Sequence, residues 1–388
     1  MNDEAIRFNK PSLEGNELAY IQTAVETGHT SCSGPYASAA GELLRDWFGA
    51  RDVLLTTSCT AALEMAALLL ELGPDDTVVV PSFTFPSTAT AFARAGAKVL
   101  FCDIERETLG LDPAHLDALL SDESVRAVAP VHYAGVGCDM DGITAAIAGR
   151  DVAVVEDNAH GLFGAYRGRP LGSLGRFAAL SFHETKNFIC GEGGALIVND
   201  ERDTDRAHVL YDKGTNRRAF MLGDVDKYSW HDLGSSFGLS EVLAAFLYGQ
   251  LEQRDVILDK RRAVTTTYQH MLTPMVDEFG LELPILPPDR DPAYHMFYVL
   301  LPDRLTRDTV IESMRRHGVQ PAFHYVPLHS APGAARFAAR PTDCPVTDDV
   351  SGRLLRLPFH NNLSLEQIDR VVDTFHGALL DARAESRN

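Results

Sequence analysis

From about Val53 onward, short apolar runs alternate along the chain with longer stretches whose apolar positions recur at helical spacing. This alternation is typical of an α/β layer structure. The apolar runs are nearly continuous, so we expect strands that are covered on both faces, as in a mostly parallel central sheet. The predicted strands are residues 77–81, 98–103, 125–131, 152–156, 177–182 and 194–198.

One helix of this region is well marked. It is rich in Ala and Leu, begins at Ser58, continues through Leu72 and stops at Gly73-Pro74. After about residue 250 the pattern changes: a helix from Glu252 leads to a proline-rich stretch over residues 283–289. We therefore predict a large α/β domain over residues 1–250 and a smaller α+β domain over residues 251–388.

The small domain has recognisable elements but no recognisable chemistry. Its predicted strands are residues 295–301 and 319–325, with a helix over residues 306–317 between them. The final helix has clear start signals, with Ser364 as N-cap and Gln367 closing a capping box. Nothing in this part of the sequence indicates a catalytic role on its own.

Composition narrows the class of protein. The formal net charge of −19 argues against a nucleic-acid binder, which needs a basic surface, although a few local basic groups could hold a nucleotide-sized ligand. No apolar run has the length of a membrane span, and the first ten residues lack a signal-peptide core. The six cysteines are scattered, without a C-x-x-C pair. We expect a cytoplasmic enzyme with reduced thiols, no metal site, and no membrane or nucleic-acid partner.

Lys186 has an unusual setting for a residue type that is scarce in this chain. It lies in Ser181-Phe-His-Glu-Thr-Lys-Asn187, directly after a predicted strand, and precedes the glycine-rich turn Gly191-Glu-Gly-Gly194. A lysine at the carboxyl end of a strand, beside backbone that can approach a ligand closely, is well placed to form a Schiff base. A lysine of a surface loop would have the same spacing, so the spacing alone leaves both interpretations open.

A second strand brings a carboxylate, Asp157, to the same edge of the sheet. Pyridoxal phosphate (PLP), the Schiff-base cofactor, needs a carboxylate against its pyridine nitrogen to make the ring an electron sink. Asp157 could supply it, whereas Glu156 should point to the other face because strand side chains alternate. Ala159 is small enough to pack against a flat ring. The alternative is that Asp157 only caps the turn that follows the strand.

Two further segments fit such a cofactor. Thr56-Thr-Ser-Cys-Thr-Ala-Ala62 opens the first helix, and small hydroxyl residues there can offer donors to a phosphate. Simple capping by Ser58 or Thr60 is the common alternative and is compatible with phosphate binding. Phe85 follows the next strand, where it could stack on the cofactor ring or belong to the core.

Taken together, Asp157 to His160, Ser181 to Lys186 and the following glycine turn resemble the DegT/DnrJ/EryC1/StrS sugar aminotransferases. The resemblance extends over nearly the whole chain, from residues 14–28 to Leu357-Pro-Phe-His360. It implies PLP-dependent fold type I, the fold of aspartate aminotransferase, in a homodimer with shared active sites. Four segments are closer still to the family's dTDP-4-amino-4,6-dideoxygalactose transaminases, and these are residues 58–67, 130–135, 213–217 and 234–236.

The resemblance also implies roles for individual residues. Lys186 corresponds to the Schiff-base lysine, Asp157 to the partner of the pyridine nitrogen, and Phe85 to the stacking aromatic. Ser58, Cys59, Thr60 and Ser181 correspond to the phosphate-binding residues, and His160 stands where relatives have Gln or His near the phenolic oxygen of the ring. Ser236 takes the place of an Asn that, in many relatives, reaches the cofactor phosphate of the partner subunit. The substrate-binding residues implied in the same way are Thr30, Ser31, Ser33, Lys213 and Arg217.

The activity implied is transfer of an amino group from L-glutamate to C4 of a dTDP-linked 4-keto-6-deoxy hexose. Amination at C3, amination of a UDP- or GDP-linked sugar, and a regulatory homologue without turnover remain alternatives. The sequence does not fix the stereochemistry of the new amine.

Overall fold

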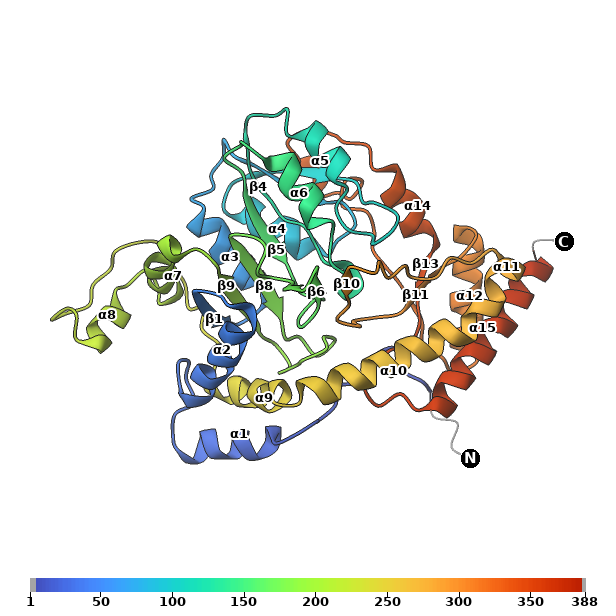
Figure 1. The fold of residues 1–388 in the computed structure, drawn as a ribbon, viewed down its shortest axis with the longest axis horizontal. Coiled ribbons are helices and arrows are strands. Elements are labelled where there is room, and N and C mark those ends of the chain that lie inside the picture. Colours follow the sequence, from blue (N-terminus) through green and yellow to red (C-terminus); the bar gives the residue numbers. More distant parts are fainter. Residues whose placement is uncertain (1–4, 386–388) are drawn as a thin grey trace.

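The structure, a computed structural model, describes residues 5–385. Its centre is a seven-stranded sheet in the order β1-β9-β8-β5-β4-β2-β3 (Figure 1). The strands from β8 to β3 in this order all run parallel to one another. Strand β9 is antiparallel to both of its neighbours, β8 and β1. The predicted mostly parallel sheet is confirmed. Its strands are β1 (Asp52–Thr56), β2 (Thr77–Pro81), β3 (Lys98–Cys102), β4 (Val125–Val128), β5 (Ala153–Asp157), β8 (Phe177–Ser181) and β9 (Gly194–Val198).

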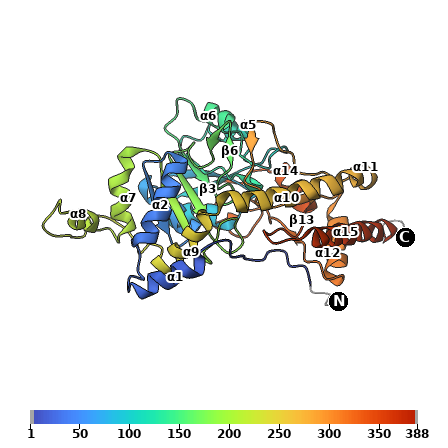
Figure 2. The same cartoon turned by 60° about the horizontal axis from the view of Figure 1, so that its bottom comes forward.

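Helices cover both faces of this sheet (Figures 1 and 2). On one face, residues of α3, α4 and α7 pack on strand residues such as Val78 and Leu196. On the other, α2 and α9 pack on residues such as Leu55 and Ile197, beside α5 and α6. The strands are therefore buried on both sides, as their continuous apolar character predicts. The helices of this domain are α1 (Glu17–Glu26), α2 (Pro35–Phe48), α3 (Cys59–Leu69), α4 (Pro86–Arg94), α5 (Pro113–Leu119), η1 (Tyr133–Gly135), α6 (Met140–Ile147), η2 (Glu201–Asp203), α7 (Thr204–Tyr211), α8 (Arg217–Leu222) and α9 (Glu241–Leu251).

Helix α3 begins as predicted, with Ser58 as its N-cap, but it ends at Leu69 rather than Leu72. The reason lies in Glu71, whose φ of 55° is left-handed and incompatible with a continuing right-handed helix.

The C-terminal part forms a second, smaller layer around the antiparallel sheet β11-β13-β12 (Figure 1). Its core includes Val299, Met314 and Phe375. The predicted capping box is confirmed: Ser364 N–H donates to Gln367 Oε1 at 3.0 Å, and Gln367 N–H donates to Ser364 Oγ at 3.2 Å. The elements here are α10 (Arg254–Leu272), η3 (Thr273–Met275), α11 (Val276–Phe279), β11 (Tyr298–Leu300), α12 (Arg304–Arg316), β12 (Ala322–Phe323), α13 (Ala334–Phe337), α14 (Pro345–Arg353), β13 (Leu354–Arg356) and α15 (Leu365–Glu385).

Two features of this layer differ from the sequence pattern. The strand predicted over residues 319–325 is reduced to β12, and the central strand β13 was not predicted. Strand β13 has only three residues and directly follows helix α14, so the sequence shows no strand periodicity there. A third small sheet, β10-β6-β7, connects the two parts; its strands are β6 (Ala165–Tyr166), β7 (Arg169–Pro170) and β10 (Arg290–Asp291).

The N-terminal segment reaches into the second layer. Ile6 is buried in the core of the small domain and forms a bridge with Val319. The division near residue 250 falls at the end of α9 and stays a proposal. Within residues 5–385, the helices are all too short or too polar to span a membrane.

Candidate active site

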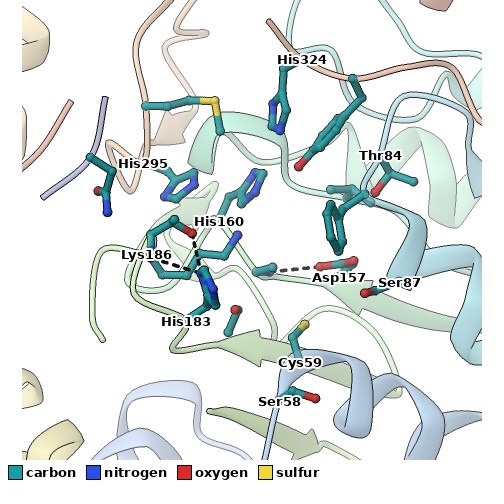
Figure 3. Close-up of a pocket in the computed structure, with 18 of the residues that line it drawn as sticks. Ser58, Cys59, Thr84, Ser87, Asp157, His160, His183, Lys186, His295 and His324 are labelled. Carbon is teal, nitrogen blue, oxygen red and sulfur yellow. Dashed lines mark hydrogen bonds between the residues drawn. The ribbon is translucent and has the colours of Figure 1, made fainter. Parts of the chain in front are cut away.

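The predicted cofactor-binding residues meet at the carboxyl edge of the large sheet. A cavity of about 510 Å³ lies there, between the ends of β5 and β8, the start of α3 and loops of the small domain (Figure 3). All but one of these residues line it: Ser58, Cys59, Thr60, Phe85, Asp157, His160, Ser181 and Lys186.

Lys186 lies in the turn after β8, and Figure 3 shows its side chain among the residues that surround the cavity. Within the described chain, no hydrogen bond or ion pair involves its Nζ. Burial lowers the pKa of Lys186 from 10.5 to about 8, and the opposing effects of Cys59 and Asp157 are smaller. The neutral, nucleophilic amine is therefore far more populated at neutral pH than it would be on an exposed lysine.

Asp157 is the last residue of β5 and is 5% exposed. Its Oδ2 accepts a hydrogen bond from Thr88 Oγ1 at 2.7 Å, and its Oδ1 accepts one from Ala159 N–H at 3.2 Å. Burial raises the pKa of Asp157, and none of the described basic side chains forms an ion pair with it. A cation that entered this end of the cavity would stabilise the carboxylate.

Glu156, one residue earlier, points to the opposite face of the sheet, as the alternation of strand side chains predicts. Its carboxylate lies 2.8 Å from His132 Nε2. It also accepts hydrogen bonds of 2.6–2.7 Å from the backbone N–H groups of Gly172, Leu174 and Gly175. This carboxylate is occupied in holding the loop before β8, so the two adjacent acids have separate tasks.

The N-terminus of α3 forms another side of the cavity. Ser58 Oγ accepts a hydrogen bond from Ala61 N–H at 3.0 Å, which confirms the cap, and Thr60 Oγ1 donates to Ser87 Oγ at 2.8 Å. Gly194 permits this arrangement, because a Cβ at that position would collide with the backbone at Ser58. A helix N-terminus of this kind offers backbone donors and a positive dipole end to an anion.

Three histidines line the cavity on the side of the small domain (Figure 3). The rings of His160 and His295 stack with centroids 4.2 Å apart, and His324 Nδ1 lies 3.0 Å from the Tyr133 hydroxyl. Burial lowers the pKa of all three histidines, so their imidazoles are neutral at neutral pH. His160 Nδ1 is buried without a hydrogen-bond partner in the described chain. Burying a polar atom in this way costs free energy unless a ligand forms a hydrogen bond with it.

Ser236 is the predicted cofactor residue that does not line this cavity. It is exposed and forms an isolated bridge with Asp212. Lys213 and Arg217 also lie near Asp212, with nitrogen atoms 3.2 Å and 3.7 Å from its carboxylate oxygens. Their assignment to a ligand stays a prediction.

The remaining predicted substrate residues lie between α1 and α2, also away from the cavity lining. The carbonyl groups of Thr30 and Ser31 accept from Glu241 N–H, at 3.3 Å and 3.1 Å. Ser33 has a left-handed φ of 66°. Within one chain, the structure does not bring this segment to Lys186.

Sequence reasoning missed the contribution of the small domain. The sequence of this domain shows no chemical signal on its own, yet four of its residues line the cavity: His295, His324, Tyr325 and Arg356. No motif marks them, and they come together only through packing. Thr88 was also missed, although a hydroxyl in the first turn of α4 is the same kind of signal that identified Ser58.

An α/β sheet that presents a desolvated lysine and a buried carboxylate at adjacent strand ends, beneath a small C-terminal domain, defines a PLP-dependent transferase of fold type I. The sequence profile of the DegT/DnrJ/EryC1/StrS aminotransferase family matches residues 11–376. The chain therefore belongs to this family, and it is a PLP-dependent aminotransferase.

Individual relatives are similar over nearly their whole length. The spore coat polysaccharide biosynthesis protein SpsC of Bacillus subtilis (strain 168) is 29% identical over 374 residues, which cover 94% of this chain and 95% of that protein. Among solved structures, sugar aminotransferase CalS13 from Micromonospora echinospora has a TM-score of 0.86 at 25% identity, covering 96% of this chain and 99% of that one. Spr1654 from Streptococcus pneumoniae, in its PMP form, has a TM-score of 0.90 at 22% identity, covering 99% and 100% of the two chains.

Proposed function

We propose that this aminotransferase transfers an amino group from L-glutamate to C4 of a nucleotide-linked sugar, converting dTDP-4-keto-6-deoxyglucose into a dTDP-4-amino-4,6-dideoxyhexose. The observation that carries the transfer chemistry is the meeting of Lys186 and Asp157 in one cavity. The choice of a sugar is supported by relatives named for polysaccharide biosynthesis and sugar amination. The choice of C4 and dTDP rests on the sequence resemblance of four segments, residues 58–67, 130–135, 213–217 and 234–236.

The cavity residues fit PLP. Lys186 Nζ and the Asp157 carboxylate have no ion-pair partner in the described chain, and His160 Nδ1 has no hydrogen-bond partner there. Lys186 would hold the reactive carbon of the cofactor, Asp157 its ring nitrogen, and the start of α3 with Ser181 its phosphate. When bound, PLP supplies an electron-withdrawing ring that stabilises negative charge on the carbon next to the transferred nitrogen.

The residues of the chain then have distinct tasks. With PLP bound, Lys186 would carry the covalent link to the cofactor, and its amine, once free, would move a proton at the reacting carbon as a general base. A pKa of about 8 suits this role, because both protonation states are accessible near neutral pH. Asp157, whose Oδ2 accepts a hydrogen bond from Thr88, would face the ring nitrogen of PLP and favour its protonated form. The neutral histidines add no positive charge that would oppose this.

A panel of nucleotide keto-sugars, tested with L-glutamate and with products identified by NMR, tests the proposal. We expect turnover of dTDP-4-keto-6-deoxyglucose, and poor turnover of the free keto-sugar, which lacks the nucleotide anchor. Amination at C3, or of a UDP- or GDP-linked sugar only, would correct the substrate. Equal amination of simple keto acids would contradict a sugar substrate, and a protein that binds PLP without any turnover would indicate a regulatory homologue.

We also propose that the enzyme is a homodimer with shared active sites. In Figures 1 and 2 the segment around α8 projects away from the body of the chain, and it carries apolar side chains that are largely exposed, including Met221 (70%) and Trp230 (80%). Exposed apolar residues in such an arm favour burial against a second copy. Ser236, Lys213 and Arg217 would then act in the site of the partner subunit, and Thr30, Ser31 and Ser33 would lie near the sugar nucleotide.

Subunit mixing tests the shared site. Lys186→Ala subunits are mixed with subunits that carry Lys213→Ala and Arg217→Ala. If each variant is inactive alone, hybrids should regain about one working site per dimer. A fully active monomer at the assay concentration would contradict the dimer.

A further inference from the structure

His295 reaches the cavity from the segment just before β11, and the backbone of this segment is firmly held. His295 N–H donates to the carbonyl of Ala134 at 3.2 Å, and the His295 carbonyl accepts from Arg261 Nη2 at 2.6 Å. Arg261 Nε also donates to the carbonyl of Tyr294 at 2.8 Å, and Tyr294 has a left-handed φ of 53°. Such a φ is unfavourable for a tyrosine and persists only where the surrounding contacts hold it. The fold therefore fixes the place of the His295 ring.

Asn187, the residue next to Lys186, determines which nitrogen of His295 carries the proton. Asn187 is 4% exposed, and its two amide atoms face two different partners. One atom lies 2.6 Å from the carbonyl oxygen of Ala293, which can only accept, so this atom must be the amide nitrogen. The other is then the amide oxygen, which can only accept, and it lies 2.8 Å from His295 Nδ1. His295 Nδ1 must therefore donate this hydrogen bond and carry a proton.

The other nitrogen of this ring, Nε2, is a hydrogen-bond acceptor that faces the cavity. Burial lowers the pKa of His295 well below its ordinary value, so at neutral pH the ring carries only the proton on Nδ1. Nε2 has no hydrogen-bond partner in residues 5–385, and it is not fully buried. The ring lines the cavity and is stacked on His160 (Figure 3). The lone pair of Nε2 therefore borders the open part of the cavity.

An acceptor at this place discriminates among the groups that the reactants offer. The carboxylates of an amino acid donor have no proton to give at neutral pH, and a lone pair repels their oxygens. The amine of the donor is consumed by the transfer, and the cofactor phosphate has a separate place at the start of α3. A keto-sugar carries hydroxyl groups, which can donate to a bare imidazole nitrogen. Because His295 is bonded to the neighbour of Lys186, the hydroxyl that it meets must lie close to the reacting carbon.

We propose that His295 Nε2 accepts a hydrogen bond from the hydroxyl on the carbon next to the reacting carbonyl of the sugar, and that Asn187 fixes the tautomer that this contact requires. In a 4-keto-6-deoxy hexose that group is the C3 hydroxyl, because C5 carries none. The inference rests on the proposed function in requiring a sugar, and it names the part of the sugar that the enzyme recognises. His295 determines specificity in this scheme, and Asn187 is a positioning residue that acts through it.

Removing the acceptor from the enzyme and the hydroxyl from the sugar, separately and together, tests the contact. At saturating glutamate, kcat/KM is measured for the parent enzyme and for His295→Phe, with dTDP-4-keto-6-deoxyglucose and with its analogue that lacks the C3 hydroxyl. Each single change should lower kcat/KM between about tenfold and a hundredfold, because it leaves a polar group in the cavity without its partner. Both changes together should cost little more than one, because the same hydrogen bond can be lost only once. His270→Phe, which alters an exposed histidine of α10, is the control and should leave kcat/KM unchanged.

The tautomer is tested on the cofactor-free enzyme. Nitrogen NMR of isotope-labelled histidine distinguishes a protonated imidazole nitrogen from a bare one, and the signals that are missing in His295→Phe are those of His295. We expect a proton on Nδ1 only. Asn187→Leu, which removes the acceptor for that proton, should let the proton occupy Nε2 and should raise the KM for the sugar. The apparent Kd for glutamate alone should stay that of the parent enzyme.

Three results would overturn the inference. The first is a parent enzyme that uses the sugar and its deoxy analogue equally well, a comparison that needs no variant and leaves the proposed function standing. The second is a pair of losses that add up when the enzyme and the sugar are changed together. The third is a proton on Nε2 of His295 in the parent enzyme. If the parent enzyme aminates no nucleotide keto-sugar at all, the proposed function fails and the hydroxyl contact fails with it.

Discussion

The two sides of the cavity are built in different ways. On the side of the large domain, the reactive groups stand at the ends of sheet strands and at a helix start, as with Lys186, Asp157 and Ser58. On the side of the small domain, they stand on loops and on a three-residue strand, as with His324 and Arg356. The side of the large domain would hold the cofactor, which is the same in every turnover. The side of the small domain would contact the amino donor and the sugar, which differ among relatives. A rigid sheet suits fixed chemistry, whereas loops on a separate layer can differ among relatives without disturbing it.

The largest effect should come from the lysine. Lys186→Ala should lower kcat by about a thousandfold or more, since it would remove both the proposed covalent link and the proposed general base. Steady-state assays measure the loss. Borohydride reduction of the parent enzyme, followed by peptide mapping, should label Lys186. Labelling of Lys213 would show that the covalent group lies elsewhere.

The adjacent acids of β5 provide the next test. Asp157→Asn should lower kcat by about a hundredfold in a folded protein, because a neutral amide cannot stabilise a protonated ring nitrogen as a carboxylate does. Glu156→Gln is the matched control. It should reduce the free energy of unfolding by about 3 kcal/mol, since it disturbs a buried network, while the activity per folded molecule stays near that of the parent. Near-normal turnover of Asp157→Asn at saturating PLP would show that Asp157 is not the carboxylate that pairs with the ring nitrogen.

The pH dependence of PLP binding to the cofactor-free enzyme should show how Arg356, on the side of the small domain, affects the pKa of Lys186 on the side of the large domain. Because the pKa of Lys186 in the folded enzyme is lowered to about 8, the neutral amine predominates above that pH. The rate at which cofactor-free enzyme captures PLP should thus fall about tenfold per unit below pH 8 and level off above it. Arg356→Gln should shift the midpoint upward, since the charge of Arg356 lowers this pKa. A midpoint near 10.5 in the parent enzyme would refute the desolvated lysine.

The smallest effect concerns the helix cap. Ser58→Ala should cost about 1 kcal/mol of unfolding free energy and should also weaken PLP binding. Ser240→Ala, at the cap of α9 and away from the cavity, should cost a similar free energy without any change in PLP affinity. Fluorescence titration of PLP measures the difference. Equal PLP affinities of the two variants would show that Ser58 acts only as the N-cap of α3.

The difference between the two sides of the cavity also determines which site residues the sequence could predict. Lys186 and Asp157 were identified because each follows a strong apolar strand, and parallel strands bring their carboxyl ends to one edge. The direction of the Glu156 side chain follows from strand alternation, although its hydrogen-bond partners do not. Arg356 could not be predicted, because a three-residue strand leaves no periodicity and its place in the cavity lining is visible only in three dimensions. The same holds for the stack of His160 on His295, which joins segments far apart in the sequence.

The N-terminal segment has a consequence for the order of folding. Ile6 exchanges backbone hydrogen bonds with Gly318 and Gln320, Phe8 accepts one from Phe359 N–H, and Phe8 and Asn9 line the cavity. Residues 6–9 must therefore wait for residues 318–359, more than 300 positions further along the chain, before they can dock. Contacts of such long sequence separation form slowly. The strands of the large sheet lie within residues 52–198 and can assemble early, but the cavity acquires its final wall only after residues 318–359 have folded.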